Sequence, residues 1–135
     1  MALALSLGQR GMGNTWPNPA VGCVIVHKGL IVGRGWTAPS GRPHAEVQAL
    51  AQAGDAARGA TVYVTLEPCP MCAGAIAQSR ISHLIFGAWD AKGGAVGSVW
   101  DVIRDPRSLY KLYVTAGICE SECADLLRDF FEGQR

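Results

Sequence analysis

The chain has 135 residues, of which 49% are hydrophobic and 17% charged, and its formal net charge is +1. This length and composition are typical of one folded domain, so we expect a single domain over residues 1–135. The near-neutral charge excludes a basic surface over the whole molecule, and any nucleic-acid site must be local. No stretch approaches the roughly twenty apolar residues that a membrane span needs. We therefore expect a cytoplasmic protein, and there an odd number of cysteines, five, argues against a disulfide framework.

The first half of the chain predicts a helix, a hairpin and a second helix. Leucines alternate over residues 3–7 and fit a short helix packed on the core. "AVGCVIV" (20–26) and "LIVGRG" (30–35) flank a tight glycine-containing turn, which is typical of two hairpin strands. "HAEVQALAQAG" (44–54) has the composition of a helix and ends in glycine.

The middle of the chain predicts two buried strands that flank a helix. "ATVYVTL" (60–66) and "ISHLIFGA" (81–88) have no polar face, as expected for strands that are covered on both sides. Between them, "MCAGAIAQSR" (71–80) is rich in small helix-forming residues.

The last third predicts a short helix, a strand and an amphipathic helix. Ser98 and Asp101 have the spacing of a capping box, so a short helix is expected to begin there. "YKLYVTAG" (110–117) is a candidate strand, and "SECADLLRDFFEG" (121–133) a final helix. The side chains of this helix that we expect to face inward are Leu126, Leu127, Phe130 and Phe131. Strands that alternate with helices predict a three-layer α/β/α domain, with a central mixed five-stranded sheet and helices on both faces.

Three residues have the types and spacing of a zinc site. Cys69 and Cys72 are separated by two residues where a strand gives way to a helix, so both sulfurs lie on one side of the first turn. The free N–H groups of that turn stabilise thiolates. His44 begins another helix and can add a nitrogen. Two sulfurs and one nitrogen give one zinc ion per chain three protein ligands and leave its fourth position open for water.

Glu46 lies two residues after His44 and is the candidate proton carrier. Zinc lowers the pKa of a bound water to near 7, and a carboxylate beside it can pass the proton on. Addition of the resulting hydroxide to an amidine-like ring carbon, with protonation of the exocyclic nitrogen, releases ammonia. The residues therefore predict hydrolytic deamination.

A C-x-x-C pair alone has other interpretations. It can be a redox pair, although thioredoxin-like motifs lie in a different strand–helix context. It can also belong to a non-catalytic structural zinc module, whose fourth ligand would be Cys119 or Cys123. Cys23 lies inside a predicted strand and is expected to be a small core residue.

The combination of H-x-E with P-C-x-x-C is much more specific, because it is the signature of zinc nucleobase deaminases. The chain resembles the cytidine deaminase-like superfamily over essentially its whole length. From "LEPCPMCAGAI" through "FGAWDAKGGAVGS" to "ECADLLRDFF" it is similar to bacterial tRNA adenosine deaminases. Its earlier segments "NTWPNPAVGCVIV" and "GRGWTAPSGRPHAE" look like the deaminase domain of the bifunctional riboflavin-biosynthesis enzyme, with a seam near residues 65–69.

The resemblance implies a substrate, contacts and an assembly. Both families imply that Asn18 and the backbone of Ala45 border the base pocket. The tRNA enzymes imply that Asp90 approaches a ribose hydroxyl and Lys92 a phosphate of the anticodon stem-loop. We therefore expect conversion of the wobble adenosine of tRNA to inosine, and a homodimer. The alternatives are deamination of a ribosylated pyrimidine of the riboflavin pathway, or of guanine or cytosine.

Overall fold

The computed structural model describes residues 1–133, and its centre is a mixed five-stranded sheet in the order β2-β1-β3-β4-β5. Strand β1 pairs antiparallel with both β2 and β3, whereas β3, β4 and β5 run parallel. The strands are β1 Gly22–His27, β2 Leu30–Trp36, β3 Thr61–Leu66, β4 His83–Ala88 and β5 Tyr113–Thr115. The predicted mixed sheet of five strands is confirmed, including the hairpin of β1 and β2 and its turn at Lys28 and Gly29.

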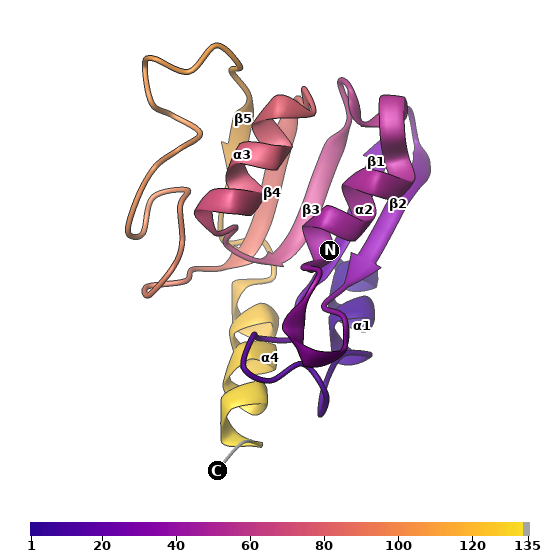
Figure 1. Ribbon diagram of the computed structural model, residues 1–135, viewed down its shortest axis with the longest axis vertical. Helices are drawn as coiled ribbons and strands as arrows, with labels where there is room; N and C mark the ends of the chain where they lie inside the picture. Colours follow the sequence, from indigo (N-terminus) through magenta and orange to yellow (C-terminus); the bar gives the residue numbers. More distant parts are fainter. Residues whose placement is uncertain (134–135) are drawn as a thin grey trace.

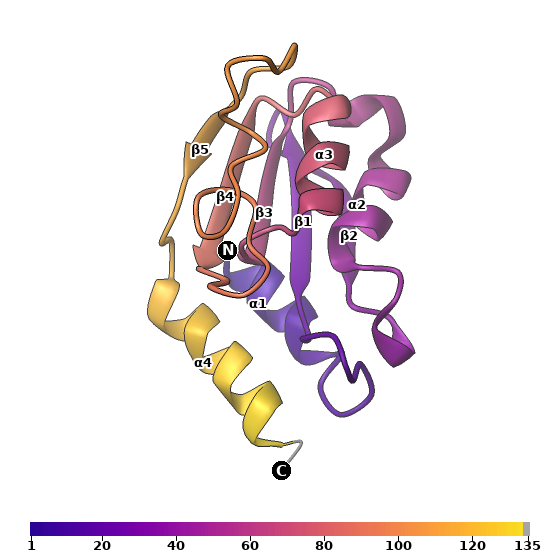
Figure 2. The same ribbon diagram turned by 60° about the vertical axis from the view of Figure 1, so that its left-hand side comes forward.

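Helices cover both faces of the sheet (Figure 1). Helices α1 (Ala2–Gln9) and α4 (Glu120–Glu132) lie on one face, and α2 (Ala45–Ala53) and α3 (Pro70–Gln78) on the other (Figure 2). This is the predicted three-layer α/β/α architecture. Among residues 1–133, no helix has both the length and the apolar character that crossing a membrane requires.

The two central parallel strands carry the core. Val62 and Val64 of β3, and Leu84 and Phe86 of β4, are all 0% exposed. These strands are covered on both sides, which explains why their sequences are apolar on both faces.

Helix α2 lies directly on the backbone of β2. A Cβ atom at Gly33 would lie 2.2 Å from the carbonyl oxygen of Ala49, and one at Gly35 would lie 2.5 Å from that of Ala45. Any side chain at these two positions would push the helix away from the sheet. The two glycines therefore set the distance between β2 and the helix that begins after His44.

The short helix expected at Ser98 is absent, and that prediction was wrong. Residues 89–112 contain no helix or strand beyond an isolated bridge between Val96 and Asp101. The side chains that would have capped a helix have other partners: the Ser98 hydroxyl donates to Glu67, and Asp101 accepts from Arg104.

The inward face of α4 differs from the prediction at one position. Cys123, Leu126 and Phe130 are buried and Leu127 packs against the core, whereas Phe131 is 42% exposed. Spacings of three and four residues place Cys123 on the buried stripe of the helix. Phe131 falls outside that stripe.

The close contact between β2 and α2 can be tested with Gly35→Ala. We expect a loss of about 1–3 kcal/mol in the free energy of unfolding, because the added methyl group overlaps backbone. Weaker zinc binding should accompany it, since the displaced helix carries His44 at its start. Gly74→Ala is the matched control: no atom lies within 4 Å of its Cβ, and alanine favours helices, so it should be neutral or stabilising by up to about 1 kcal/mol. Chemical denaturation and zinc titration measure both effects.

Candidate active site

The predicted metal ligands meet where two helices begin. His44 is the N-cap of α2, and Cys69 is the N-cap of α3, whose first residue is Pro70. Proline suits this position because the N–H it lacks has no partner inside the helix. Cys72 follows one turn into α3 and is buried. The structure thus brings together side chains that are 28 residues apart in the sequence.

The separations between these side chains fit zinc. The Nδ1 atom of His44 lies 3.5 Å from Sγ of Cys72 and 3.8 Å from Sγ of Cys69. Zinc bonds of about 2.3 Å to sulfur and about 2.0 Å to nitrogen, at tetrahedral angles, hold such atoms about 3.5 Å apart. The Nε2 atom of His44 is buried without a hydrogen-bond partner in the described chain, and Nδ1 is the ring nitrogen that faces the two sulfurs.

The group has three protein ligands. Among residues 1–133, His44, Cys69 and Cys72 form the one cluster of potential metal ligands, with their ligand atoms within 4.8 Å of one another. Cys119 is exposed, and Cys123 is buried against the sheet, where a Cβ on Gly87 would lie 2.2 Å from its sulfur. Neither seals the group as a fourth ligand, contrary to the structural-zinc interpretation. A set of three ligands is that of a catalytic zinc site.

The pKa values of the two thiols shift in opposite directions. The hydrogen bond from Cys72 lowers the pKa of Cys69 to about 4. The same bond raises the pKa of Cys72, and burial raises it further. The pKa of His44 is raised, chiefly by its hydrogen bond with Cys69. A stable thiolate beside an imidazole is a ready ligand set for a divalent ion.

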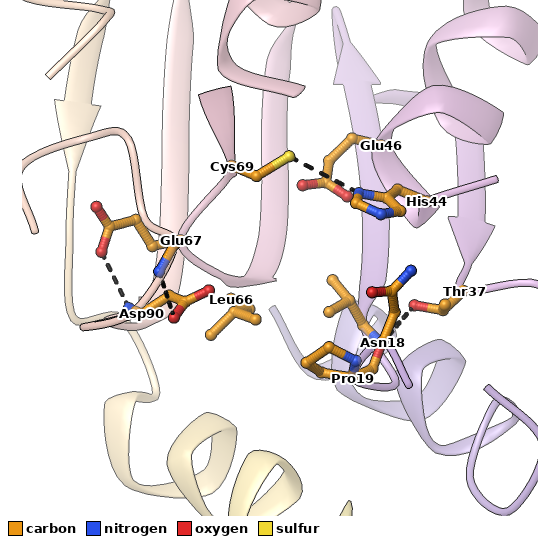
Figure 3. A pocket seen from close by; sticks show the side chains of 11 residues that line it. Asn18, Pro19, Thr37, His44, Glu46, Leu66, Glu67, Cys69 and Asp90 are labelled. Carbon is orange, nitrogen blue, oxygen red and sulfur yellow. Dashed lines mark hydrogen bonds between the residues drawn. The ribbon is translucent and has the colours of Figure 1, made fainter. Parts of the chain in front are cut away.

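Glu46 lies beside the metal group and is buried, with 5% of its surface exposed. Burial raises the pKa of this carboxyl to about 6. A carboxyl group with a pKa near neutrality can both accept and release a proton, which a proton carrier must do. Figure 3 shows Glu46 next to the His44 ring and the Cys69 sulfur.

A pocket opens in front of these residues at one edge of the sheet. It is lined by residues from five places in the chain: Asn18, Pro19 and Val21 before β1, Thr37 after β2, His44 and Glu46 at the start of α2, Leu66, Glu67 and Cys69 at and after the end of β3, and Asp90 and Gly93 after β4. This edge collects the carboxyl ends of β2, β3 and β4, where open α/β sheets bind their ligands.

Of the residues predicted to bind substrate, Asn18 and Asp90 line the pocket and Lys92 does not. Asn18 lines the pocket, and its Nδ2 atom donates to the Gly41 carbonyl at 2.8 Å, which leaves the side-chain oxygen for a ligand. Ala45 follows His44 as the first residue of α2, and its side chain is fully buried. Asp90 lines the pocket, whereas Lys92 is exposed outside it and its backbone N–H donates to Asp90.

Sequence reasoning did not identify two residues that line the pocket, Thr37 and Glu67. The Thr37 hydroxyl accepts from the Val21 N–H and donates to the Pro19 carbonyl, both at 2.9 Å, and so fixes the segment before β1. Nothing in the sequence indicates this contact. Glu67 had a visible signal, because it is an acidic residue directly after a predicted buried strand without charged residues, and it is 2% exposed.

A family model for the cytidine and deoxycytidylate deaminase zinc-binding region matches residues 1–88. The chain belongs to this deaminase family. The match includes the zinc-binding region of the family, and His44, Cys69 and Cys72 are positioned to bind a metal ion.

Two groups of relatives are similar to the chain. The riboflavin biosynthesis protein RibD of Aquifex aeolicus (strain VF5) is 44% identical over 137 residues, which cover 97% of this chain and 37% of that protein. The tRNA-specific adenosine deaminase of Bacillus subtilis (strain 168) is 39% identical over 124 residues, which cover 85% of this chain and 77% of that protein. The chain thus spans well under half the length of the riboflavin relative.

Solved structures from both groups are similar to the chain. A structure from a study of A-to-I editing by tRNA:A34 deaminases at the wobble position of transfer RNA has a TM-score of 0.79 at 34% identity. That match covers 94% of this chain and 97% of the other. The RibD of Acinetobacter baumannii has a TM-score of 0.76 at 35% identity, over 98% of this chain and 38% of the other.

Zinc ligation can be tested with Cys72→Ser. We expect zinc content to fall from one ion per chain to near zero, because the variant loses one of three ligands and a serine hydroxyl is a much poorer ligand than a thiolate. Cys119→Ser removes an exposed thiol outside the group and should keep its zinc. Elemental analysis of the two purified variants gives the answer. Full zinc content in the Cys72 variant would contradict the assignment.

Proposed function

We propose that this chain is a hydrolytic deaminase that converts the wobble adenosine of tRNA to inosine. The proposal rests on the arrangement of the pocket. The metal group and Glu46 lie on one side of it, and the loop that begins at Asp90 lies on the other. The similarity supports the proposal, since the structure matches a solved chain from the tRNA:A34 deaminase study with a TM-score of 0.79.

The proposed mechanism assigns one task to each group of residues. His44, Cys69 and Cys72 would hold the metal where helices α2 and α3 begin. Zinc, when bound, supplies a water molecule that loses its proton near neutral pH. Glu46 would accept one proton of the water and deliver it to the ring nitrogen, and would then pass the second proton to the amine, which leaves as ammonia. Burial of Glu46 keeps its proton away from bulk solvent between the two transfers.

A ribosylated pyrimidine of the riboflavin pathway is the second candidate substrate. The pocket wall before β1 is formed by Asn18 and Pro19, from the segment that looks like the riboflavin enzyme. The side-chain oxygen of Asn18 offers an acceptor to a small heterocycle. The 44% identity to RibD of Aquifex aeolicus supports this alternative.

The two candidates can be separated by turnover. The zinc-loaded protein is offered an anticodon stem-loop with adenosine at the wobble position, the riboflavin pyrimidine intermediate, guanine and cytidine, and ammonia is measured for each. We expect release from the stem-loop, with inosine in the product. Release from the pyrimidine intermediate alone would contradict the tRNA proposal and support the second candidate.

The role of Glu46 can be tested with Glu46→Gln. We expect ammonia release to fall by about 10²–10⁴-fold, because the amide cannot carry the proton. Zinc content should stay at one ion per chain, since Glu46 is not in the metal cluster. Glu122→Gln, on the exposed side of α4, is the matched control and should keep full activity. Activity that survives the Glu46 change would refute the proton-carrier role.

The proposal includes a cytoplasmic homodimer. The cytoplasm keeps cysteines reduced, and all five are free in the structure. Large apolar side chains such as Met71 and Trp100 are 49% and 52% exposed, and exposed apolar surface is often covered by a partner. Light scattering of the purified protein should give twice the chain mass of 14.3 kDa. A mass equal to one chain would contradict the dimer.

A further inference from the structure

Glu67 is a buried acid that the proposed chemistry does not use. It is 2% exposed and lies between β3 and Cys69, but it is outside the metal cluster. A carboxylate in such a place is costly unless hydrogen bonds replace its lost water. Its partners therefore indicate what it does.

All of those partners lie on the loop that follows β4. One oxygen, Oε1, accepts from the Asp90 N–H at 3.0 Å and from the Ser98 hydroxyl. The other, Oε2, accepts from the N–H groups of Val96 at 2.9 Å and Ser98 at 3.0 Å. The carboxylate thus receives four donors from residues 90–98, a segment without helix or strand.

The loop wraps closely around this carboxylate. A Cβ on Gly94 would lie between 2.3 and 2.5 Å from three carboxyl atoms of Glu67. Two backbone bonds flank the contact: the Glu67 N–H donates to the Ala88 carbonyl, and the Ala95 N–H donates to the Pro68 carbonyl, both at 2.8 Å. Figure 3 shows Glu67 beside Asp90, across the pocket from His44 and Glu46.

We propose that Glu67 is a positioning residue that holds loop 90–98 in place as the wall of the pocket. Its carboxylate substitutes for the hydrogen bonds that a helix or sheet would give this segment. The segment that carries Glu67 also carries Cys69, so the metal site and the opposite wall share one support. Asp90 and Gly93 are then in position before a substrate arrives.

Glu67→Gln tests the proposal with almost no change in volume. A glutamine oxygen can face the N–H groups of Val96 and Ser98, and its NH₂ group then faces the other two donors. The Ser98 hydroxyl can rotate and accept, but the Asp90 N–H cannot, so it loses its partner. We expect amide hydrogen exchange over residues 89–98 to become about tenfold faster. Zinc content and exchange in β1 and β3 should stay as in the wild type.

Two further variants keep the test decisive. Ser98→Ala removes one hydroxyl and leaves three backbone donors, so loop exchange should rise much less than in the glutamine variant. Gly94→Ala leaves Glu67 itself unchanged but pushes against its carboxylate, and it should reproduce the fast loop exchange. If Glu67→Gln does not fold, the glycine variant decides the outcome by itself.

A kinetic measurement separates positioning from general stability. With the anticodon stem-loop as substrate, Glu67→Gln should raise KM about tenfold and change kcat much less, because Glu46 and the ligands are untouched. This arm rests on the proposed function, whereas the exchange arm does not. If the wild type does not turn over the stem-loop while the variant loop exchanges faster, the tRNA proposal fails and the role of Glu67 stands.

Three results would overturn the role of Glu67. The first is wild-type exchange over residues 89–98 in the zinc-loaded glutamine variant. The second is an equal acceleration in β1, β3 and the loop, which would show a general contribution to stability. The third is a loss of zinc from the glutamine variant, which would show that Glu67 maintains the metal site and not the loop.

Discussion

The site depends on how abruptly the chain changes from strand to helix after β3. Leu66 is the last residue of the strand and Pro70 the first of α3, so three residues make the change. Within that step, Glu67 faces the loop after β4 and Cys69 faces His44. Proline at Pro68 and Pro70 restricts the backbone on both sides of the cysteine. The metal group and the pocket wall therefore share one short segment, and a shift in it would move both.

The charges at this edge of the sheet balance one another. Buried thiols and the buried carboxyl of Glu46 would repel one another if all were ionised, and a cation among them removes that conflict. The N-termini of α2 and α3 both face the group, and their free N–H groups favour negative charge. The raised pKa of Glu46, about 6, reflects its burial in this place. The same burial that suits the carboxyl to its proposed role as proton carrier also favours a cation at this place.

The sequence predicted the metal group, the sheet and most helices, because these follow from local spacing and apolar patterns. H-x-E and C-x-x-C each lie within one helical turn. The two motifs come together because they follow β2 and β3, whose carboxyl ends lie at the same end of the sheet. The predictions failed where distant partners decide the conformation. Ser98 has the spacing of a cap, but its N–H and hydroxyl both donate to Glu67, 31 residues away. Thr37 acts through Pro19 and Val21, contacts that no local pattern encodes.

The contact between β2 and α2 has a consequence for how such an enzyme can diversify. At Gly33 and Gly35 the helix meets bare main chain, which has no rotamers to repack. Changes in neighbouring side chains cannot make room for a larger residue at either position. The position of His44, at the start of α2, therefore cannot vary in small steps. The segments before β1 and after β4 face no such restriction. New substrates would have to be accommodated in these loops, around a catalytic centre that stays where it is.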